Sequence, residues 1–177
     1  MCVKGIKNMA EKFLTLMAEL DDDTQTRMSE WYDVLKKAGF IGTQTPGLPY
    51  HISLATFPLE KEQEAAALTK EIASSFSEIP VHISHIGLFS GGKVLFSAPE
   101  REAKLNELYE ACKIGSEETY PWTPHITMLI DEPDKVYAAL ALLMKSFSPF
   151  VGTIVRLRLC AFWPTREIVS VELHKDK

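Results

Sequence analysis

The stretch "PHITML" at residues 124–129 has an earlier counterpart in the four letters "HISL". Each stretch places a histidine and a hydroxyl residue two positions apart, His51 with Ser53 and His125 with Thr127. Alternate side chains of a β-strand point to opposite faces, so each histidine would share a face with its hydroxyl residue, and the apolar residues between them would share the other face. The two stretches therefore predict two strands, each with one polar face and one apolar face that packs on helices.

The segments around these two strands repeat the same order of expected elements. A first strand is expected at residues 12–20, with a short helix as the alternative, and a helix-strand-helix-strand-strand unit then occurs twice. Gly91 and Gly92 between two apolar runs are a strong signal for a hairpin. His51 and His125 occupy equivalent places, 74 positions apart. The expected elements are helices at residues 21–39, 60–76, 97–115 and 132–147, and strands at residues 50–57, 81–89, 93–98, 124–130, 152–163 and 167–173.

This order predicts an internal duplication within one domain. The fold class is α+β, a bilobal fold in which two antiparallel sheets face a central cleft and the helices cover the outer faces. The single domain is expected at residues 9–177, with pseudo-repeats at about 23–98 and 99–174. Residues 1–8 are expected to be a disordered leader, because the sequence from Met9 reads like a fresh start.

Composition limits the partners that the chain can have. The net charge of −5 argues against binding long nucleic acid, which needs many Lys and Arg residues against phosphates, but it allows a small nucleotide or an RNA terminus. No apolar run approaches the roughly 18 residues that a membrane-spanning helix needs. The three cysteines form no CxxC pair and favour reduced thiols. We therefore expect a cytoplasmic, monomeric protein without membrane association, metal or other cofactor.

The two histidines have the residue type and placement for acid–base chemistry. If a pseudo-two-fold axis relates the lobes, His51 and His125 face each other across the cleft. An imidazole with a pKa near 6.5 can either accept or donate a proton at neutral pH, as attack at a phosphorus atom requires. The H-x-[ST] pattern alone is weak, and a third match at His82 and Ser84 has no counterpart in the second half. We therefore interpret His82 as an ordinary strand residue.

The motifs H-I-S-L and H-I-T-M, together with "WTPHITM" and the hairpin "IGLFSGGKVLFSAP", resemble those of the 2H phosphoesterase superfamily. That family includes 2′-5′ RNA ligase-like proteins and cyclic phosphodiesterases, and the resemblance extends from about residue 12 to residue 173. It implies metal-independent hydrolysis of 2′,3′-cyclic phosphates of nucleotides or RNA ends, or of a related cyclic phosphodiester. It assigns catalysis to His51 and His125, with Ser53 and Thr127 orienting the phosphate.

The chain departs from the family pattern at two places. Ser53 stands where threonine is commoner, which the pattern tolerates. Many members carry an arginine shortly after the second motif, where this chain has "LID" at residues 129–131. The second departure removes an expected phosphate contact and points to a different substrate. The alternative function is a nucleotide-binding or sensor module on the same fold, without turnover. A purely structural protein would leave the matched spacing of the motifs unexplained.

Other residues are candidate substrate contacts. Arg156 and Arg158 alternate with apolar residues and would point to the open face of their strand, where they could hold a phosphate; a solvated strand face is the alternative. Tyr50 and Trp122 are candidates to stack on a nucleobase, with a place in the core or at the rim as the alternative. The same two interpretations apply to three further aromatic residues near the motifs or loop ends, Tyr120, Phe162 and Trp163.

An acidic run at residues 21–23 allows two interpretations. Three aspartates could bind a metal ion. They also stand at the start of a predicted helix, where acidic residues satisfy free backbone N–H groups and complement the helix dipole. We predict capping.

Overall fold

The computed structural model describes residues 12–116 and 121–175. The leader expected at residues 1–8 and Tyr120 lie outside the described residues. Among the described residues, no helix is long and apolar enough to cross a membrane.

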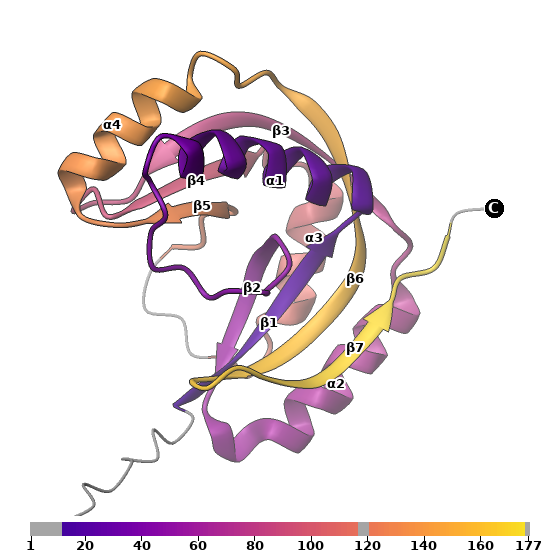
Figure 1. Ribbon diagram of the computed structural model, residues 1–177. Helices are drawn as coiled ribbons and strands as arrows, with labels where there is room; N and C mark the ends of the chain where they lie inside the picture. The colour runs from indigo at the N-terminus through magenta and orange to yellow at the C-terminus, as the bar shows by residue number, and fades with distance from the viewer. Residues whose placement is uncertain (1–11, 117–120, 176–177) are drawn as a thin grey trace, which may run out of the picture.

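The observed elements follow the predicted order, one strand and then two helix-strand-helix-strand-strand units (Figure 1). This order confirms the α+β class, although it does not test the duplication itself. The elements are β1 (Phe13–Leu20), α1 (Asp22–Lys37), β2 (His51–Phe57), η1 (Leu59–Lys61), α2 (Glu62–Ser75), β3 (Ile79–Leu88), β4 (Val94–Pro99), α3 (Ala103–Cys112), β5 (Ile126–Ile130), α4 (Pro133–Leu143), β6 (Phe150–Phe162) and β7 (Arg166–Glu172).

The two separate sheets predicted from the sequence are not observed. The strands form one antiparallel sheet in the order β2-β1-β6-β3-β4-β5, and β7 also pairs with β6. The reason is the length of β6, 13 residues. Its first part pairs with β3 up to Ile154, and its remainder pairs with β1 on one edge and with β7 on the other. A single long strand thus belongs to both lobes and joins them into a continuous ladder.

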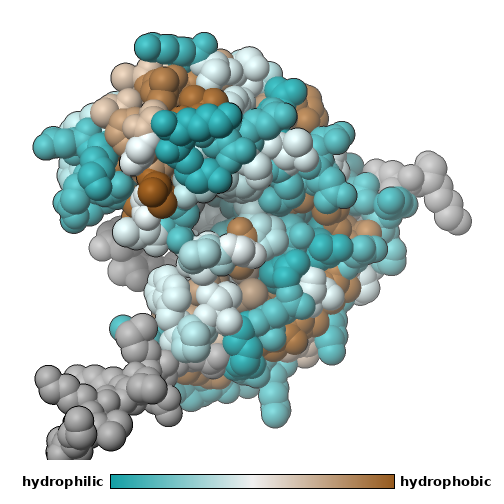
Figure 2. All heavy atoms as spheres, in the orientation of Figure 1, coloured by the Kyte–Doolittle hydropathy of each residue, from teal (hydrophilic) through white to brown (hydrophobic). Residues whose placement is uncertain are grey.

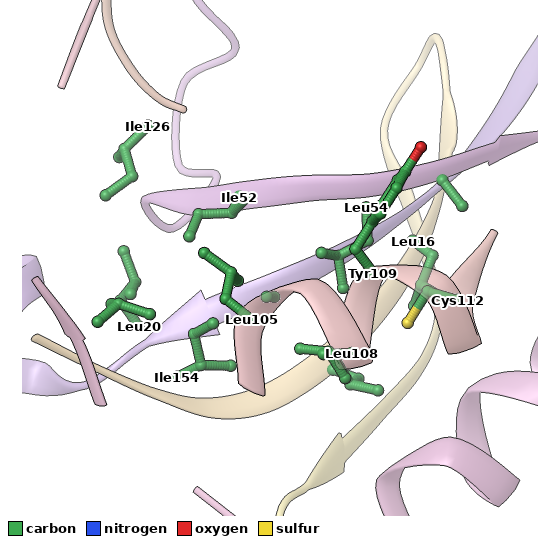
Figure 3. Close-up of a cluster of buried hydrophobic side chains, with 14 of the residues drawn as sticks. Leu16, Leu20, Ile52, Leu54, Leu105, Leu108, Tyr109, Cys112, Ile126 and Ile154 are labelled. Carbon is green, nitrogen blue, oxygen red and sulfur yellow. The ribbon is translucent and has the colours of Figure 1, made fainter. Parts of the chain in front are cut away.

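The helices also join the two halves of the chain. α1 precedes β2 in sequence but packs against β5, β6 and α4, whereas α3 precedes β5 but packs against β2 and β3. Figure 3 shows α3 directing Leu105 and Leu108 toward side chains of β1, β2 and β6, among them Leu16 and Ile52. α2 covers β1, β6 and β7. Each half therefore buries apolar surface of the other, and their buried residues form one main core.

The helix ends explain two details of the sequence. The side chain of Asp21 accepts a hydrogen bond from the backbone N–H of Thr24 at 2.7 Å and caps α1, so the capping prediction is confirmed. The third helix was expected from residue 97, but Pro99 is the last residue of β4, opposite Ile83, and α3 begins only at Ala103. A strand end accepts proline because no further ladder hydrogen bond is needed there.

Candidate active site

The two motif histidines are anchored in the same way. The Nδ1 atom of His51 lies 2.8 Å from the carbonyl oxygen of Pro49, and the Nδ1 atom of His125 lies 2.8 Å from the carbonyl oxygen of Thr123. A carbonyl oxygen only accepts hydrogen bonds, so Nδ1 must carry the proton in both rings. In each neutral ring Nε2 is then the nitrogen with a free lone pair. Both imidazoles are therefore fixed in the tautomer that leaves Nε2 able to take up a proton.

Both motifs also contain a β-bulge at the same position. The ladder between β1 and β2 skips Leu54, which follows Ser53, and the ladder between β4 and β5 skips Met128, which follows Thr127. In each motif the skipped residue and its successor are both buried. A bulge bends a strand and redirects the side chains next to it. Matching bulges directly after both hydroxyl residues indicate that the two motifs have the same local geometry.

The bulge in β5 changes which apolar side chains reach the core. Strict alternation after His125 would bury Ile130. Instead Leu129 is fully buried, and Ile130 is half-buried and lines the cleft.

Both imidazoles have lowered pKa values. Burial lowers the pKa of His51 below the ordinary 6.5; the bond to Pro49 opposes this, and the nearby His125 lowers it further. Burial likewise lowers the pKa of His125, against the opposing effect of its bond to Thr123. A buried imidazole loses hydration that the charged form needs more than the neutral form does. At neutral pH both rings are therefore mostly neutral when no anion is bound, and His125 is near enough to His51 to lower its pKa.

A cleft of about 550 Å³ contains both hydroxyl residues and one of the histidines. Ser53, Thr127 and His51 line it from β2 and β5, and the segment at residues 41–50 supplies much of the remaining wall. Neither hydroxyl forms a hydrogen bond with another side chain in the part of the chain that the structure describes. Both are therefore available to a bound molecule.

His125 lies at the margin of the cleft, outside its lining. Its ring meets Phe89 edge-on, with the ring centroids 4.7 Å apart, and Phe96 at 5.5 Å. The aromatic contacts and the bond to Thr123 fix the imidazole plane. The predicted meeting of the two histidine strands is supported by direct packing of β2 against β5.

Arg156 and Arg158 lie on the face opposite their buried apolar neighbours, as the alternation in the sequence predicts, but both guanidinium groups are engaged by carboxylates. Glu19 on β1 accepts from Arg156 Nη1 at 3.0 Å and from Arg158 Nε at 2.8 Å. Arg156 also pairs with Glu172 at 3.0 Å, and Arg158 with Glu167. Neither arginine lines the cleft. Their expected contact with a substrate phosphate stays a prediction.

Glu19 is a residue near the site that the motif analysis did not single out. In the sheet register it pairs with His51 on one side and with Arg156 on the other, so the three side chains share one face. Only 8% of its surface is exposed, and its negative charge raises the pKa of His51. The available signal was a lone acidic residue in the apolar run "KFLTLMAEL". A buried carboxylate needs a partner, but the sequence does not say which one.

The aromatic candidates divide into two groups. Tyr50 lines the cleft, and burial raises its pKa to about 12, so its phenol stays protonated. Phe162 and Trp163 also line the cleft. Trp122 does not: its indole N–H donates to the carbonyl oxygen of Ser53 at 2.9 Å, and its ring stacks on Tyr109 at 4.0 Å. Its contacts favour a structural link between the two motif segments, and the predicted stacking on a substrate remains untested.

The amide of Gln25 is a further feature that motif reasoning missed. It accepts from the backbone N–H of Tyr50 and donates to the carbonyl oxygen of the same residue, each at 2.8 Å. The amide thus forms the two hydrogen bonds that the backbone of a neighbouring strand would form with Tyr50. It fixes the backbone next to His51, whose imidazole is held by Pro49.

The third H-x-S match lies away from the cleft. His82 contacts Glu102, and Ser84 donates to Glu100 at 2.6 Å. On β3, His82 is exposed and Ser84 is half-buried, and neither lines the cleft. This placement agrees with the interpretation of His82 as an ordinary strand residue.

The family model described as the 2′-5′ RNA ligase superfamily matches residues 20–161 of the chain. The chain belongs to the 2′-5′ RNA ligase superfamily. This membership confirms the resemblance to 2H phosphoesterases and supports phosphoesterase-type activity. No curated protein matches the chain.

Solved structures share the fold of this superfamily member at low sequence identity. E. coli LigT in its apo form has a TM-score of 0.65 and 18% identity, with 94% of this chain and all (100%) of that chain covered. The protein TT0787 of Thermus thermophilus has a TM-score of 0.64 and 16% identity, covering 93% and 100%. A protein described as a phosphoesterase has a TM-score of 0.63 and 17% identity, covering 93% and 99%.

Proposed function

We propose that the chain hydrolyses 2′,3′-cyclic phosphates of nucleotides or RNA ends, or a related cyclic phosphodiester, by two-histidine acid–base catalysis. The observation that carries this proposal is the matched anchoring of His51 and His125, each with Nδ1 on the carbonyl oxygen two residues earlier and Nε2 left for proton transfer. Two hydroxyl residues without side-chain partners, Ser53 and Thr127, stand beside them in the cleft.

In the proposed reaction, one imidazole takes a proton from a water molecule as the water oxygen attacks phosphorus. The bond from phosphorus to one ribose oxygen breaks, and the second imidazole, protonated, gives its proton to that leaving oxygen. The product is a phosphomonoester, and the two rings end with their protonation states exchanged. A second proton transfer through solvent restores them. Each step needs one neutral and one protonated ring.

The lowered pKa values fit this requirement once an anion is bound. Without a bound anion both rings are mostly neutral near pH 7, because burial disfavours their charged forms. A phosphodiester brings one negative charge next to the rings and raises their pKa values. Binding should therefore draw one proton into the site and create the acid. The hydroxyls of Ser53 and Thr127 would donate to the non-bridging oxygens as negative charge builds up on them.

Ligands seen in the fold relatives are consistent with a small substrate. E. coli LigT has been crystallised with 3′-AMP, with ATP and with NADP⁺. Those complexes describe LigT. For this chain they support the choice of nucleotides as the first compounds to test.

The test measures turnover of 2′,3′-cyclic nucleotides and of short RNAs that end in a cyclic phosphate, with a chelator present. His51→Ala and His125→Ala should each lower kcat by at least about 100-fold, the usual contribution of a general acid or base. His82→Ala is the matched control, because it removes a histidine of the same motif type outside the cleft, and it should retain full activity.

Equal turnover by all four proteins would refute the catalytic assignment. Tight binding of the nucleotide without turnover by the wild-type chain would instead favour the nucleotide-binding module.

A further inference from the structure

The cleft has an unusual charge character for a site that binds phosphate. None of its described lining residues is a lysine, arginine, aspartate or glutamate. Its polar groups are one imidazole, the amide of Gln44 and several hydroxyls. A site of this kind can bind one anionic group at the histidines, where a ring can be protonated, but it offers no fixed positive charge elsewhere.

Arg156 and Arg158 lie on the same sheet face as His51 but outside the cleft lining, and they do not change this balance. Arg156 and Arg158 are paired with Glu19, and each has a second carboxylate partner, Glu172 and Glu167 respectively. Two positive charges thus stand against three negative charges. A guanidinium held in this way is not available to a phosphate unless an existing ion pair breaks. The network therefore adds no net positive potential to the cleft.

The far wall of the cleft is apolar and aromatic. Phe13 stacks on Phe162 with ring centroids 5.8 Å apart, and the edge of Trp163 meets Phe13 at 5.4 Å. Leu48 and Met17 pack beside them. On the face of the molecule that Figure 2 shows, hydrophilic residues alternate with smaller apolar patches. Such a wall favours a flat or apolar uncharged group.

From these three observations we infer that the substrate is a phosphodiester with a single negative charge and an uncharged aromatic or apolar group, and that the cleft rejects substrates with a further phosphate. A second phosphate in the cleft would lose hydration without gaining a cation, which is costly in a partly enclosed site. The inference rests on the proposed function. It narrows the expected substrates to 2′,3′-cyclic phosphates of nucleosides with a free 5′-hydroxyl, or to cyclic diesters of similar charge, and it excludes RNA ends.

The test compares adenosine 2′,3′-cyclic phosphate with the same compound phosphorylated at the 5′-oxygen. The two differ only in the second phosphate. We expect kcat/KM to be at least about tenfold lower for the 5′-phosphorylated compound, and its Kd, measured by calorimetry on the His125→Ala variant that should not consume the ligand, to be higher by a similar factor. Equal or better use of the 5′-phosphorylated compound, or of a short RNA with a cyclic end, would overturn the inference.

Two variants of Leu48 test whether the preference for a single negative charge depends on the charge of the cleft wall. Leu48→Arg introduces a cation beside the aromatic wall and should reduce the discrimination to about twofold or less, whereas Leu48→Gln, similar in size and polar but neutral, should preserve it. Discrimination unchanged by the arginine would argue against a charge origin.

The outcomes separate this inference from the proposed reaction. Turnover of both compounds with equal efficiency would refute the charge preference and leave the reaction standing. Binding that discriminates without any turnover would refute the reaction and support the charge preference. Failure to bind either compound would refute both.

Discussion

The pairing of Glu19 with two arginines leads to a prediction about stability. Its side chain is 11% exposed, against 30% for Arg156 and 19% for Arg158. Three guanidinium nitrogens lie within 3.0 Å of its two oxygens, Arg156 Nη1 at 3.0 Å, Arg158 Nε at 2.8 Å and Arg158 Nη2 at 2.6 Å. Glu19→Gln keeps the shape of the side chain but removes the charge, and it turns one acceptor into a donor that faces a guanidinium.

The expected loss of unfolding free energy is about 3 kcal/mol, because each guanidinium loses its buried carboxylate partner and keeps only a more exposed one, Glu172 or Glu167. Glu172→Gln is the matched control. Glu172 pairs with the same Arg156 at 3.0 Å, but its side chain is 76% exposed. Water screens that pair, so the control should lose less than about 1 kcal/mol.

Urea unfolding followed by circular dichroism, with equal m-values for all three proteins, measures both changes. A loss by Glu19→Gln within about 1 kcal/mol of the control would refute the assignment of Glu19 as the electrostatic centre of this face. A second readout concerns His51, whose pKa Glu19 raises. The limb of the pH profile of kcat/KM that reports His51 should therefore move to lower pH in the Glu19→Gln variant.

Three further predictions test the site and the core. His51 has a folded-state pKa below the ordinary 6.5, so the unfolded chain binds more protons as the pH falls below that value and stability is lost. Between about pH 7.5 and about pH 5.5 the melting temperature of the wild-type chain should therefore fall more than that of His51→Asn; parallel curves would contradict the burial of this imidazole. Trp122→Phe replaces the indole with a smaller aromatic ring and removes the N–H that donates to the carbonyl oxygen of Ser53, which should cost at least about 1 kcal/mol in urea unfolding; a change near zero would show that neither the bond nor the larger ring contributes to stability. Gly152→Ala places a Cβ atom 2.4 Å from Thr24 Oγ1 and should destabilise the chain by about 1–3 kcal/mol in the same assay; an unchanged midpoint would mean that α1 moves away from β6 without cost.

The order of elements and the faces of the two motif strands were predictable because they depend on neighbours in the sequence. Periodicity of 3.6 or 2 residues reports which side of an element is apolar. For this reason the sequence alone predicts that Ile52 and Ile126 are buried and that the motif hydroxyls lie on the opposite face of their strands. The helix cap at Asp21 is of the same kind, since it joins residues three positions apart.

The candidate site was only partly predictable. The equivalence of His51 and His125 gave the location, but the matching bulges after Ser53 and Thr127 depend on how β1 and β4 pair with them. Strand pairing over long sequence separations has no local signal. The same limitation explains why Ile130 reached the cleft against the expected alternation.

What the sequence by itself determined is therefore the α+β class, the element order and the pair of histidine strands, all of which rest on short-range patterns. Only the tertiary structure decided that β6 joins both lobes into one sheet, that α1 and α3 each cover strands of the other half, and that Glu19 pairs with both Arg156 and Arg158. Glu19 and its two arginines are more than 100 positions apart in the sequence. Contacts of that range are determined by the packing of the whole chain, which no short-range pattern reports.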